Sequence, residues 1–414
     1  MRDVDASFVR TALADLALGD DVVAAATARA IAAAEAWPHV IALAVQWRVV
    51  PQVYEALGRC GAIDDFDAGL RARLRSQVFA QALHSASIVR TCSLVQELLA
   101  QAGVISVAIK GIATIATIYG AASRRMVADV DLVIEEDRLA PARTALEGAG
   151  FADISPPFEA HVAAIGYSRY LHNYARTFVR DGVEIDLHWQ FGPRPPAALS
   201  ARRILERSVE VPAERVNVRV SGPIETALVA VHHALRNSFP ATSTPKDAAD
   251  LAMWWQRFGD AQGDALIAAA LESGLASSML ALGRVIAQRN AEAAISRGVT
   301  AMEAPLSRTE RREAERLRSF VERNLRGESP DNTTVELLAP AVFTRSIVGP
   351  LLRNARRGER NPQGDGAETP GVRRPLLVRI CGRLARAGRI GRELLRLERV
   401  ASYRAVARAQ SRFH

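Results

Sequence analysis

Two short acidic patterns in the chain place carboxylates at spacings that suit metal chemistry. The segment DVDLVI carries Asp129 and Asp131, and the later segment VEIDLHW carries Glu184, Asp186 and His188. In an extended strand every second side chain points to the same face. Each set of polar residues therefore shares one face of its strand, and the apolar residues between them share the other. If the two strands are neighbours in one sheet, their carboxylates converge.

Converging carboxylates repel one another and raise one another's pKa. Divalent cations remove that cost. Mg²⁺ prefers oxygen ligands and is commonly held by a few carboxylates together with substrate phosphates. Two such ions about 4 Å apart can bind the attacking and the leaving oxygen of a phosphoryl displacement. The acidic patterns therefore predict a site for Mg²⁺ or Mn²⁺ that serves phosphoryl-group chemistry.

A lysine lies upstream of these acids, in VAIKGIATIATIYG (107–120). The chain has 53 basic residues, and all of them except Lys110 and Lys246 are arginines. An ammonium is a compact point charge, whereas a guanidinium is a wide fork. A strand that ends at Lys110 and enters a helix at Gly111 would present backbone N–H groups at a positive helix end, which suits an anion. We expect this turn to face a triphosphate.

The secondary-structure elements that must position these residues are predicted from hydrophobic periodicity and composition, which differ along the chain. Residues 1–100 and 222–353 have the apolar three-and-four spacing of helices, whereas residues 101–221 mix strand and helix patterns. Residues 354–372 are rich in Gly, Pro and charge and are typical of a linker, and residues 373–414 form a basic amphipathic helix pattern. The strand candidates in the middle region are 104–110, 129–136, 174–180, 183–191 and 215–220. The pair Asp181-Gly182 predicts a hairpin.

The order of the motifs resembles a known family. The segments IKGIATIATIYG, RRMVADVDLVI and VEIDLHW follow the pattern of the nucleotidyltransferase-like family: Lys-Gly, a helix with a Tyr, an Arg, Asp-x-Asp-Leu, and later Asp-Leu-His-Trp. The upstream VIALAVQWRVVPQVYEAL and the downstream ALVAVHHALRN and DAADLAMWW are similar to that family's helices. The resemblance covers residues 37–260. It implies an α+β fold, the mixed sheet of the polymerase-β-like nucleotidyltransferases, embedded between two helical regions.

The resemblance also implies roles for single residues. Asp129 and Asp131 match the metal-binding pair, and Asp186 matches the third carboxylate, which would hold a metal and help to deprotonate the acceptor. The residues that match the nucleotide-binding positions are Lys110, Gly111 and Arg125. His188 and Trp189 match a His-Trp pair to which we assign no role.

Two positions depart from the family pattern. Ile112 follows Gly111, where the wider superfamily often has a serine that contacts phosphate. Further on, Arg236 and Asn237 stand where a second histidine is expected, which leaves the roles of His232 and His233 open.

Each candidate also has a structural alternative. The two aspartates of DVDLVI could be solvated residues at a strand end, and Lys110 and Arg125 could be surface cations. Glu184 could face solvent at the hairpin, and His188 could be a packed histidine beside Trp189.

The charge of the chain is unevenly distributed. The formal net charge is +8. Residues 373–414 hold twelve arginines and two glutamates, a net of +10, which leaves +8 − 10 = −2 for residues 1–372. The body is therefore nearly neutral and not a basic nucleic-acid binder. The tail could pack on its own body, on a second copy, on an anionic membrane surface or on nucleic acid.

Cysteine usage and hydropathy bear on location. The three cysteines show no CxxC or Cys/His ligand spacing, so neither a disulfide framework nor a structural zinc is expected. We find no signal peptide and no apolar run of about 18 residues. The arginine bias suggests a GC-rich bacterial genome. We expect a bacterial cytoplasmic protein, with contact to a membrane surface as an open alternative.

Three functional hypotheses follow. The first is a metal-dependent nucleotidyltransferase that moves a nucleoside monophosphate from an NTP, with ATP as the expected nucleotide, to an unidentified acceptor. The second is a non-catalytic nucleotide-binding sensor or scaffold, which the missing hydroxyl at position 112 makes possible. The third is a binding module driven by the basic tail.

Overall fold

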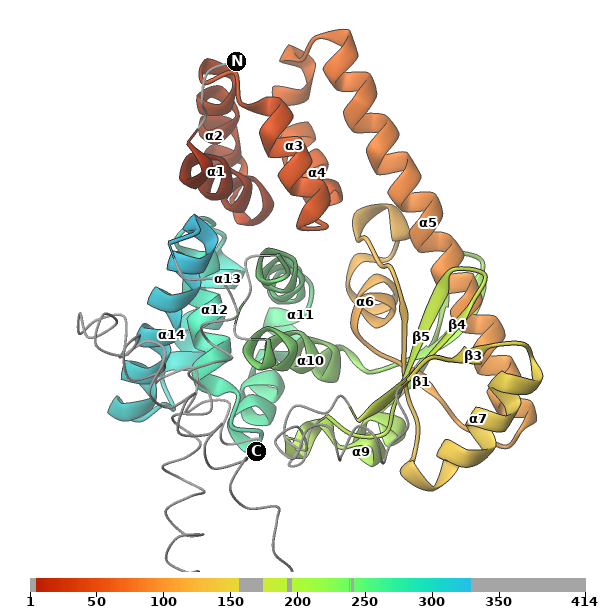
Figure 1. Cartoon of the computed structure of the whole chain (residues 1–414). Helices are drawn as coiled ribbons and strands as arrows, with labels where there is room; N and C mark the ends of the chain where they lie inside the picture. Colours follow the sequence, from red (N-terminus) through yellow and green to blue (C-terminus); the bar gives the residue numbers. More distant parts are fainter. Residues whose placement is uncertain (1–4, 156–173, 192–195, 238, 240–241, 329–414) are drawn as a thin grey trace, which may run out of the picture.

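The structure is a computed structural model, and it describes residues 5–155, 174–191, 196–237, 239 and 242–328. A seven-stranded mixed sheet forms one half of the molecule, and helices from both ends of the described chain form the other half (Figure 1). The predicted α+β class is confirmed. The predicted linker 354–372 and the basic tail 373–414 lie outside the described residues, and the division at residues 101 and 221 stays a proposal.

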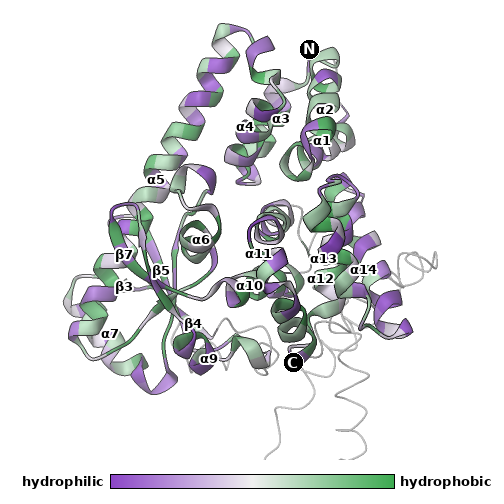
Figure 2. Cartoon of the chain, turned by 180° about the vertical axis from the view of Figure 1, so that it is seen from behind, coloured by the Kyte–Doolittle hydropathy of each residue, from purple (hydrophilic) through white to green (hydrophobic). Residues whose placement is uncertain are grey.

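The N-terminal part is helical, as predicted. It contains α1 (Ala6–Leu18), α2 (Asp21–Ala33), α3 (Trp37–Gln46), α4 (Val50–Arg59), the 3₁₀ turn η1 (Ala62–Asp65) and the long helix α5 (Ala68–Gln101). Asp67 caps α5, because its side chain accepts a hydrogen bond of 2.8 Å from the Leu70 N–H. Hydrophilic and hydrophobic residues alternate along α5 (Figure 2), as in a helix that packs on one side only.

The sheet has the strand order β3-β4-β5-β2-β1-β7-β6. Its strands are β1 (Val107–Ala108), β2 (Val130–Val133), β3 (Ala152–Asp153), β4 (Ala175–Arg180), β5 (Val183–His188), β6 (Val209–Ala213) and β7 (Val216–Val220). Strand β2 runs parallel to β5 and antiparallel to β1, so the sheet is mixed. The expected strands 104–110 and 129–136 are shorter than predicted, and β6 was not predicted.

The predicted hairpin joins β4 and β5. Asp181 and Gly182 both have positive φ, at 53° and 75°, as the two central residues of a type I′ turn require. The register that results pairs Thr177 with Asp186 and Ala175 with His188. The turn therefore decides which residue of β4 stands beside each residue of the second acidic pattern.

Short helices connect the strands. They are α6 (Lys110–Thr114), the π-helix η2 (Ile115–Tyr119), the 3₁₀ turns η3 (Ala122–Arg124), η4 (Glu136–Arg138) and η6 (Ala197–Leu199), and helices α7 (Leu139–Gly148) and α9 (Ala201–Glu206). One apolar core lies between the sheet, α5 and α7, and includes Val89, Leu132, Leu146 and Ile185. Strand β2 is buried along its whole length, which is typical of a central strand.

The C-terminal helices complete the second half. They are α10 (Pro223–Arg236), α11 (Thr244–Glu272), α12 (Ala276–Ala287), α13 (Ala293–Glu303) and α14 (Arg308–Arg326). A second core joins residues of α1, such as Leu13, to residues of α11 and α14, such as Leu266 and Phe320. Arg289 reinforces this contact, because it pairs with Asp15 at 2.9 Å and with Glu322 at 2.7 Å. Helices from both ends of the described chain thus share one interior.

None of the described helices is long and apolar enough to cross a membrane.

Candidate active site

The parallel pairing of β2 and β5 brings the two acidic patterns together. Asp131 stands directly beside Asp186, and Val133 stands beside His188. The Thr177 hydroxyl on β4 donates a hydrogen bond of 2.6 Å to Oδ1 of Asp186. The predicted convergence of carboxylates from two separate strands is therefore present for Asp131 and Asp186.

Asp131 is buried, with 3% of its side chain exposed. Its Oδ1 accepts from the Lys110 ammonium and lies 2.9 Å from Nε2 of His188. Burial alone would raise the pKa of the Asp131 carboxyl. The positive charge of Lys110 and the hydrogen bond from His188 outweigh burial and hold this pKa well below its usual range. Asp131 is therefore ionised and is neutralised from within the protein.

Lys110 reaches Asp131 because β1 ends beside β2. The Ile109 N–H donates a hydrogen bond of 3.0 Å to the Asp131 carbonyl, and Lys110 follows at the start of α6. Lys110 has a φ of 52°, a left-handed conformation that costs a residue other than glycine about 1 kcal/mol. Burial disfavours the charge on its ammonium, but Asp131, with Asp129 and Asp186, raises its pKa. The amine stays charged, in contact with Asp131 and within the field of two further carboxylates.

Asp129 lies one residue before β2 and is half-buried. Among the described residues it has neither a hydrogen bond nor an ion pair to its side chain. Burial and the nearby Asp131 carboxylate raise the pKa of Asp129, while the charges of Lys110 and Arg48 act in the opposite direction. Asp129 thus has no direct partner for its charge among the described residues.

Three side chains are close enough to share one cation. One ligand atom each from Asp131, Asp186 and His188 lie within 4.8 Å of one another. Nδ1 of His188 is buried and has no hydrogen-bond partner among the described residues. Carboxylate oxygens suit Mg²⁺ and Mn²⁺, and imidazole suits transition metals. The donor set therefore fits a divalent cation. Of the three predicted metal ligands, this group contains Asp131 and Asp186 but not Asp129, and it includes His188, which was not predicted to bind metal.

Close packing against Val127 excludes a side chain at Gly111. A Cβ added there would lie 2.7 Å from Cγ2 of Val127, closer than any real contact. The next residue, Ile112, is fully buried in the core between the sheet and α5. The side chain at position 112, where the wider family often has a hydroxyl, thus packs inside the protein.

Arg125 is buried and is used in an ion pair. Its Nε and Nη2 each donate a hydrogen bond of 2.7 Å to the Asp250 carboxylate on α11, and its Nη1 donates to the Met126 carbonyl. The neighbouring Arg124 pairs with Glu55 on α4 at 2.6 Å. The structure therefore directs both arginines to the surrounding helices, and a phosphate contact by Arg125 stays an untested prediction.

The histidines of α10 lie in two different surroundings. Nδ1 of His233 is 3.0 Å from the Asp247 carboxylate, which also pairs with Lys246 at 3.1 Å. His232 is buried, and its ring packs edge-on against Phe191, whose other neighbour is the His188 ring, stacked at 5.9 Å between centroids. Helix α10 is thus packed beside the end of β5.

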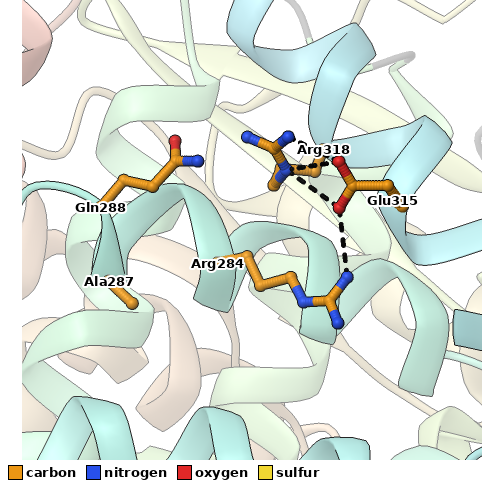
Figure 3. A pocket seen from close by; sticks show the side chains of 5 residues that line it. All are labelled: Arg284, Ala287, Gln288, Glu315 and Arg318. Carbon is orange, nitrogen blue, oxygen red and sulfur yellow. Dashed lines mark hydrogen bonds and ion pairs between the residues drawn. The ribbon is translucent and has the colours of Figure 1, made fainter.

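A surface depression elsewhere offers no comparable chemistry. It is lined by Arg284, Ala287 and Gln288 of the α12 region and by Glu315 and Arg318 of α14 (Figure 3). Both guanidinium groups bond to the Glu315 carboxylate, Arg284 at 3.2 Å and Arg318 at 3.1 Å. The two charges are therefore engaged by an acid, and the depression lies on the helical half, away from the sheet (Figure 1).

Fold and site together define a protein that gathers acids and an amine at the centre of a mixed sheet flanked by helices. A family model described as an uncharacterised nucleotidyltransferase matches residues 33–290. This match spans more than half of the chain, and the chain belongs to that family. The matched residues include every predicted site residue. No curated protein and no solved structure matches the chain.

Proposed function

We propose that the chain is a metal-dependent enzyme that transfers a nucleoside monophosphate from an NTP to an acceptor hydroxyl or phosphate, with release of pyrophosphate. One observation carries the proposal: Asp131 and Asp186 lie side by side on neighbouring strands with His188, and a lysine ammonium contacts the first of them. Membership of a nucleotidyltransferase family supports the same reaction class.

The proposed cation site consists of Asp131, Asp186 and His188, with Asp129 at its edge. A bound Mg²⁺ or Mn²⁺ would polarise the phosphoryl oxygens and neutralise the charge that develops on them. Among the described residues, one oxygen of Asp186 accepts a hydrogen bond from Thr177 and the other accepts none, so the second oxygen is available to orient and deprotonate an acceptor hydroxyl.

Lys110 has two roles in this proposal. Without ligand it neutralises Asp131, and with nucleotide it contacts a phosphate. About a quarter of its side chain, 27%, is exposed, so the ammonium can leave the carboxylate without unfolding α6. Its compact charge suits a contact to the single oxygen of Asp131, where the wide planar guanidinium of arginine would need several aligned acceptors. Gly111 follows it in the same turn.

Transfer of label tests the reaction. The purified chain is incubated with each α-labelled NTP and Mg²⁺ or Mn²⁺, with and without a cell extract that supplies acceptors. We expect label transfer that is abolished in Asp131→Asn and in Asp186→Asn. Asp64→Asn, on an exposed turn remote from the sheet, is the matched control and should keep full activity. Far-UV circular dichroism confirms that each variant is folded.

Other outcomes separate the alternatives. Nucleotide binding without transfer to any acceptor would favour the sensor or scaffold. Transfer that persists in both aspartate variants would contradict the proposed site.

Binding of Mn²⁺ tests the cation site without turnover. We expect one nitrogen ligand, seen as ¹⁴N modulation in pulsed EPR of bound Mn²⁺, and its loss in His188→Gln. Asp186→Asn should weaken Mn²⁺ binding at least tenfold, because changes even to residues that only support a metal ligand cost about 10- to 100-fold in affinity. If Mn²⁺ binds the native chain without nitrogen modulation, His188 is not a ligand and only packs beside Phe191.

A further inference from the structure

The outer face of helix α5 exposes several large apolar side chains. Phe79, Leu83 and Leu94 have exposed fractions of 65%, 55% and 65%. At 3.6 residues per turn, the steps of four and eleven residues between them place all three on one face of the helix. The other exposed large hydrophobic residues of the described chain are spread over different elements, for example Val22 on α2 and Leu271 on α11. An exposed apolar patch of this kind marks an interaction surface.

The inner face of α5 fixes this helix to the sheet. The Ser85 hydroxyl accepts a hydrogen bond of 3.1 Å from the Val127 N–H, just before β2. Gln96 makes two hydrogen bonds to the backbone of Arg219 on β7, at 2.7 Å and 3.0 Å. Helix α5 runs along one edge of the molecule in both views (Figures 1 and 2). Its outer face is therefore a preformed surface.

The exposed positions on this face are spaced with two-fold symmetry. They are Ala72, Ser76, Phe79, Leu83, Arg90, Leu94, Glu97 and Gln101. Counted from the first position the steps are four, three and four residues, and counted backwards from the last position they are the same. Each position therefore has a mate, and the two numbers of each pair share one sum, as in 79 + 94 = 76 + 97. Two antiparallel copies of α5 would bring these mates face to face.

The residues that such a pairing joins are complementary. Phe79 of one copy would face Leu94 of the other, and Leu83 would face the apolar stem of Arg90. Glu97 would face the turn that carries Arg75. Arg75 and Glu97 are both exposed, and neither has an ion pair within the described part of the chain. Every contact would occur twice, as a two-fold interface requires.

Charge favours a second copy over the chain's own basic tail as the occupant of this face. The exposed charges of α5 include Arg73, Arg75 and Arg90 against Glu97. Residues 373–414 carry twelve arginines and two glutamates, so their approach would add positive charge to a face that is already basic. In the antiparallel pair, by contrast, the acid of each copy meets a base of the other.

We propose that the outer face of α5 is a homodimer interface, in which two copies of this helix pack antiparallel about a two-fold axis beside Ser87. The small side chain of Ser87 is exposed at the centre of the face and lets the two backbones approach closely. This interface lies outside the acidic site, and the inference does not depend on the proposed nucleotidyl transfer.

Sedimentation velocity of the full chain at several concentrations tests the interface. We expect a dimer that dissociates on dilution. Phe79→Gln combined with Leu94→Gln should weaken the dimer about 100-fold, because each change removes two apolar side chains from a two-fold interface. Val22→Gln, which removes an exposed apolar side chain from α2, is the matched control and should dimerise like the native chain. All three positions are exposed, so thermal unfolding should stay native in every variant.

Charge reversal tests the ionic contact. Arg75→Glu should weaken the dimer about tenfold, because it sets two acids against each other at both ends of the interface. Arg75→Glu combined with Glu97→Arg in one chain should restore the native dimer, since the two charges are only exchanged. A double variant that is weaker than either single variant would contradict this contact.

Cross-linking tests the direction of the helices. In a Cys60→Ser and Cys381→Ser background, a short bismaleimide should join a chain with Ser76→Cys to a chain with Glu97→Cys. It should not join two chains with Ser76→Cys, because in the antiparallel pair these positions lie about 30 Å apart along the helix axis. Efficient joining of two Ser76→Cys chains would show a parallel pair and would overturn the proposed symmetry.

The remaining outcomes name other occupants. A chain that is monomeric at every concentration would overturn the proposal, also where it binds anionic vesicles and loses that binding in the Phe79→Gln, Leu94→Gln variant. A dimer that survives in this variant but is lost on deletion of residues 373–414 would assign dimerisation to the tail and would overturn it too.

Discussion

Lys110 and Asp131 form an ion pair in which a partly exposed ammonium neutralises a buried carboxylate. Asp131 lies on β2, and Lys110 begins α6 just after the neighbouring strand β1. The same carboxylate oxygen also contacts His188. A positive charge therefore already stands beside the acids before any metal or nucleotide arrives. A divalent cation must either share the carboxylates with this amine or displace it.

Removal of the Lys110 charge should make the fold depend on metal. In Lys110→Met, Asp131 loses one partner, and the free energy of unfolding should fall by about 1–3 kcal/mol. Added Mg²⁺ should restore much of the loss, because it replaces the missing charge. Urea unfolding with and without Mg²⁺ measures both effects. Lys246→Met, which removes the amine from Asp247, is the control and should lose stability without recovery by Mg²⁺. Equal responses to Mg²⁺ in the two variants would count against the cation site.

Breaking the buried pair between Arg125 and Asp250 should be costly. Both side chains are 3% exposed, and loss of one partner of such a pair destabilises a protein by about 3–5 kcal/mol. Arg125→Met alone should therefore lower the free energy of unfolding by that amount. Arg125→Met combined with Asp250→Leu should recover most of it.

The double variant also tests the predicted phosphate contact of Arg125. If it regains stability but not affinity for tripolyphosphate, Arg125 contacts phosphate in the complex. If both return to native values, the arginine only joins the sheet region to α11.

Gly111 should be required by packing. In Gly111→Ala the new Cβ meets Val127, and this overpacking should cost about 1–3 kcal/mol of unfolding free energy. Val127→Ala in the same chain should reduce that cost, so the two changes are not additive. Gly148→Ala is the control: its Cβ meets no atom within 4 Å, and it should stabilise α7. Additive losses for Gly111→Ala and Val127→Ala would argue against a direct clash.

Stability should depend on pH through Asp247. Burial would raise the pKa of this carboxyl, but Lys246 and His233 hold it well below its usual range. A lowered pKa in the folded state means that the ion pair stabilises the protein above the unfolded pKa of about 3.8, and that this contribution is lost as pH falls further. Asp247→Asn should therefore have a lower free energy of unfolding than the native chain at pH 7, and this difference in free energy should shrink below about pH 4.

Urea unfolding at several pH values measures this difference in free energy. Asp260→Asn, at an exposed pair with Arg297, should show almost no difference at any pH.

Local patterns predicted much of the site. The Asp181-Gly182 turn fixes the β4–β5 register, and alternation along the strands places Asp186 and His188 on one face, so both are accessible to reasoning from the sequence. The convergence of Asp131 with Asp186 needed one further assumption, that the two strands are neighbours. The β2–β5 pairing confirms it.

Long-range partners escaped prediction for a physical reason. Arg125 and Asp250 are separated by 125 positions, and no local sequence pattern predicts that the two side chains form a buried ion pair. The grouping of His188 with Asp131 required the parallel register, which periodicity alone does not supply.

The core shared by α1 and α14 affects how the chain can fold during its synthesis. Leu13 leaves the ribosome long before Phe320, although the two lie in one interior. At about 5–20 residues per second, their synthesis is separated by roughly 15–60 s. During that interval the part of α1 that packs on α11 and α14 has no partner, although α2, α3 and α4 are already present and the strands can already pair. The nascent chain therefore exposes an apolar helix face during most of translation. A chaperone can bind this face in that period.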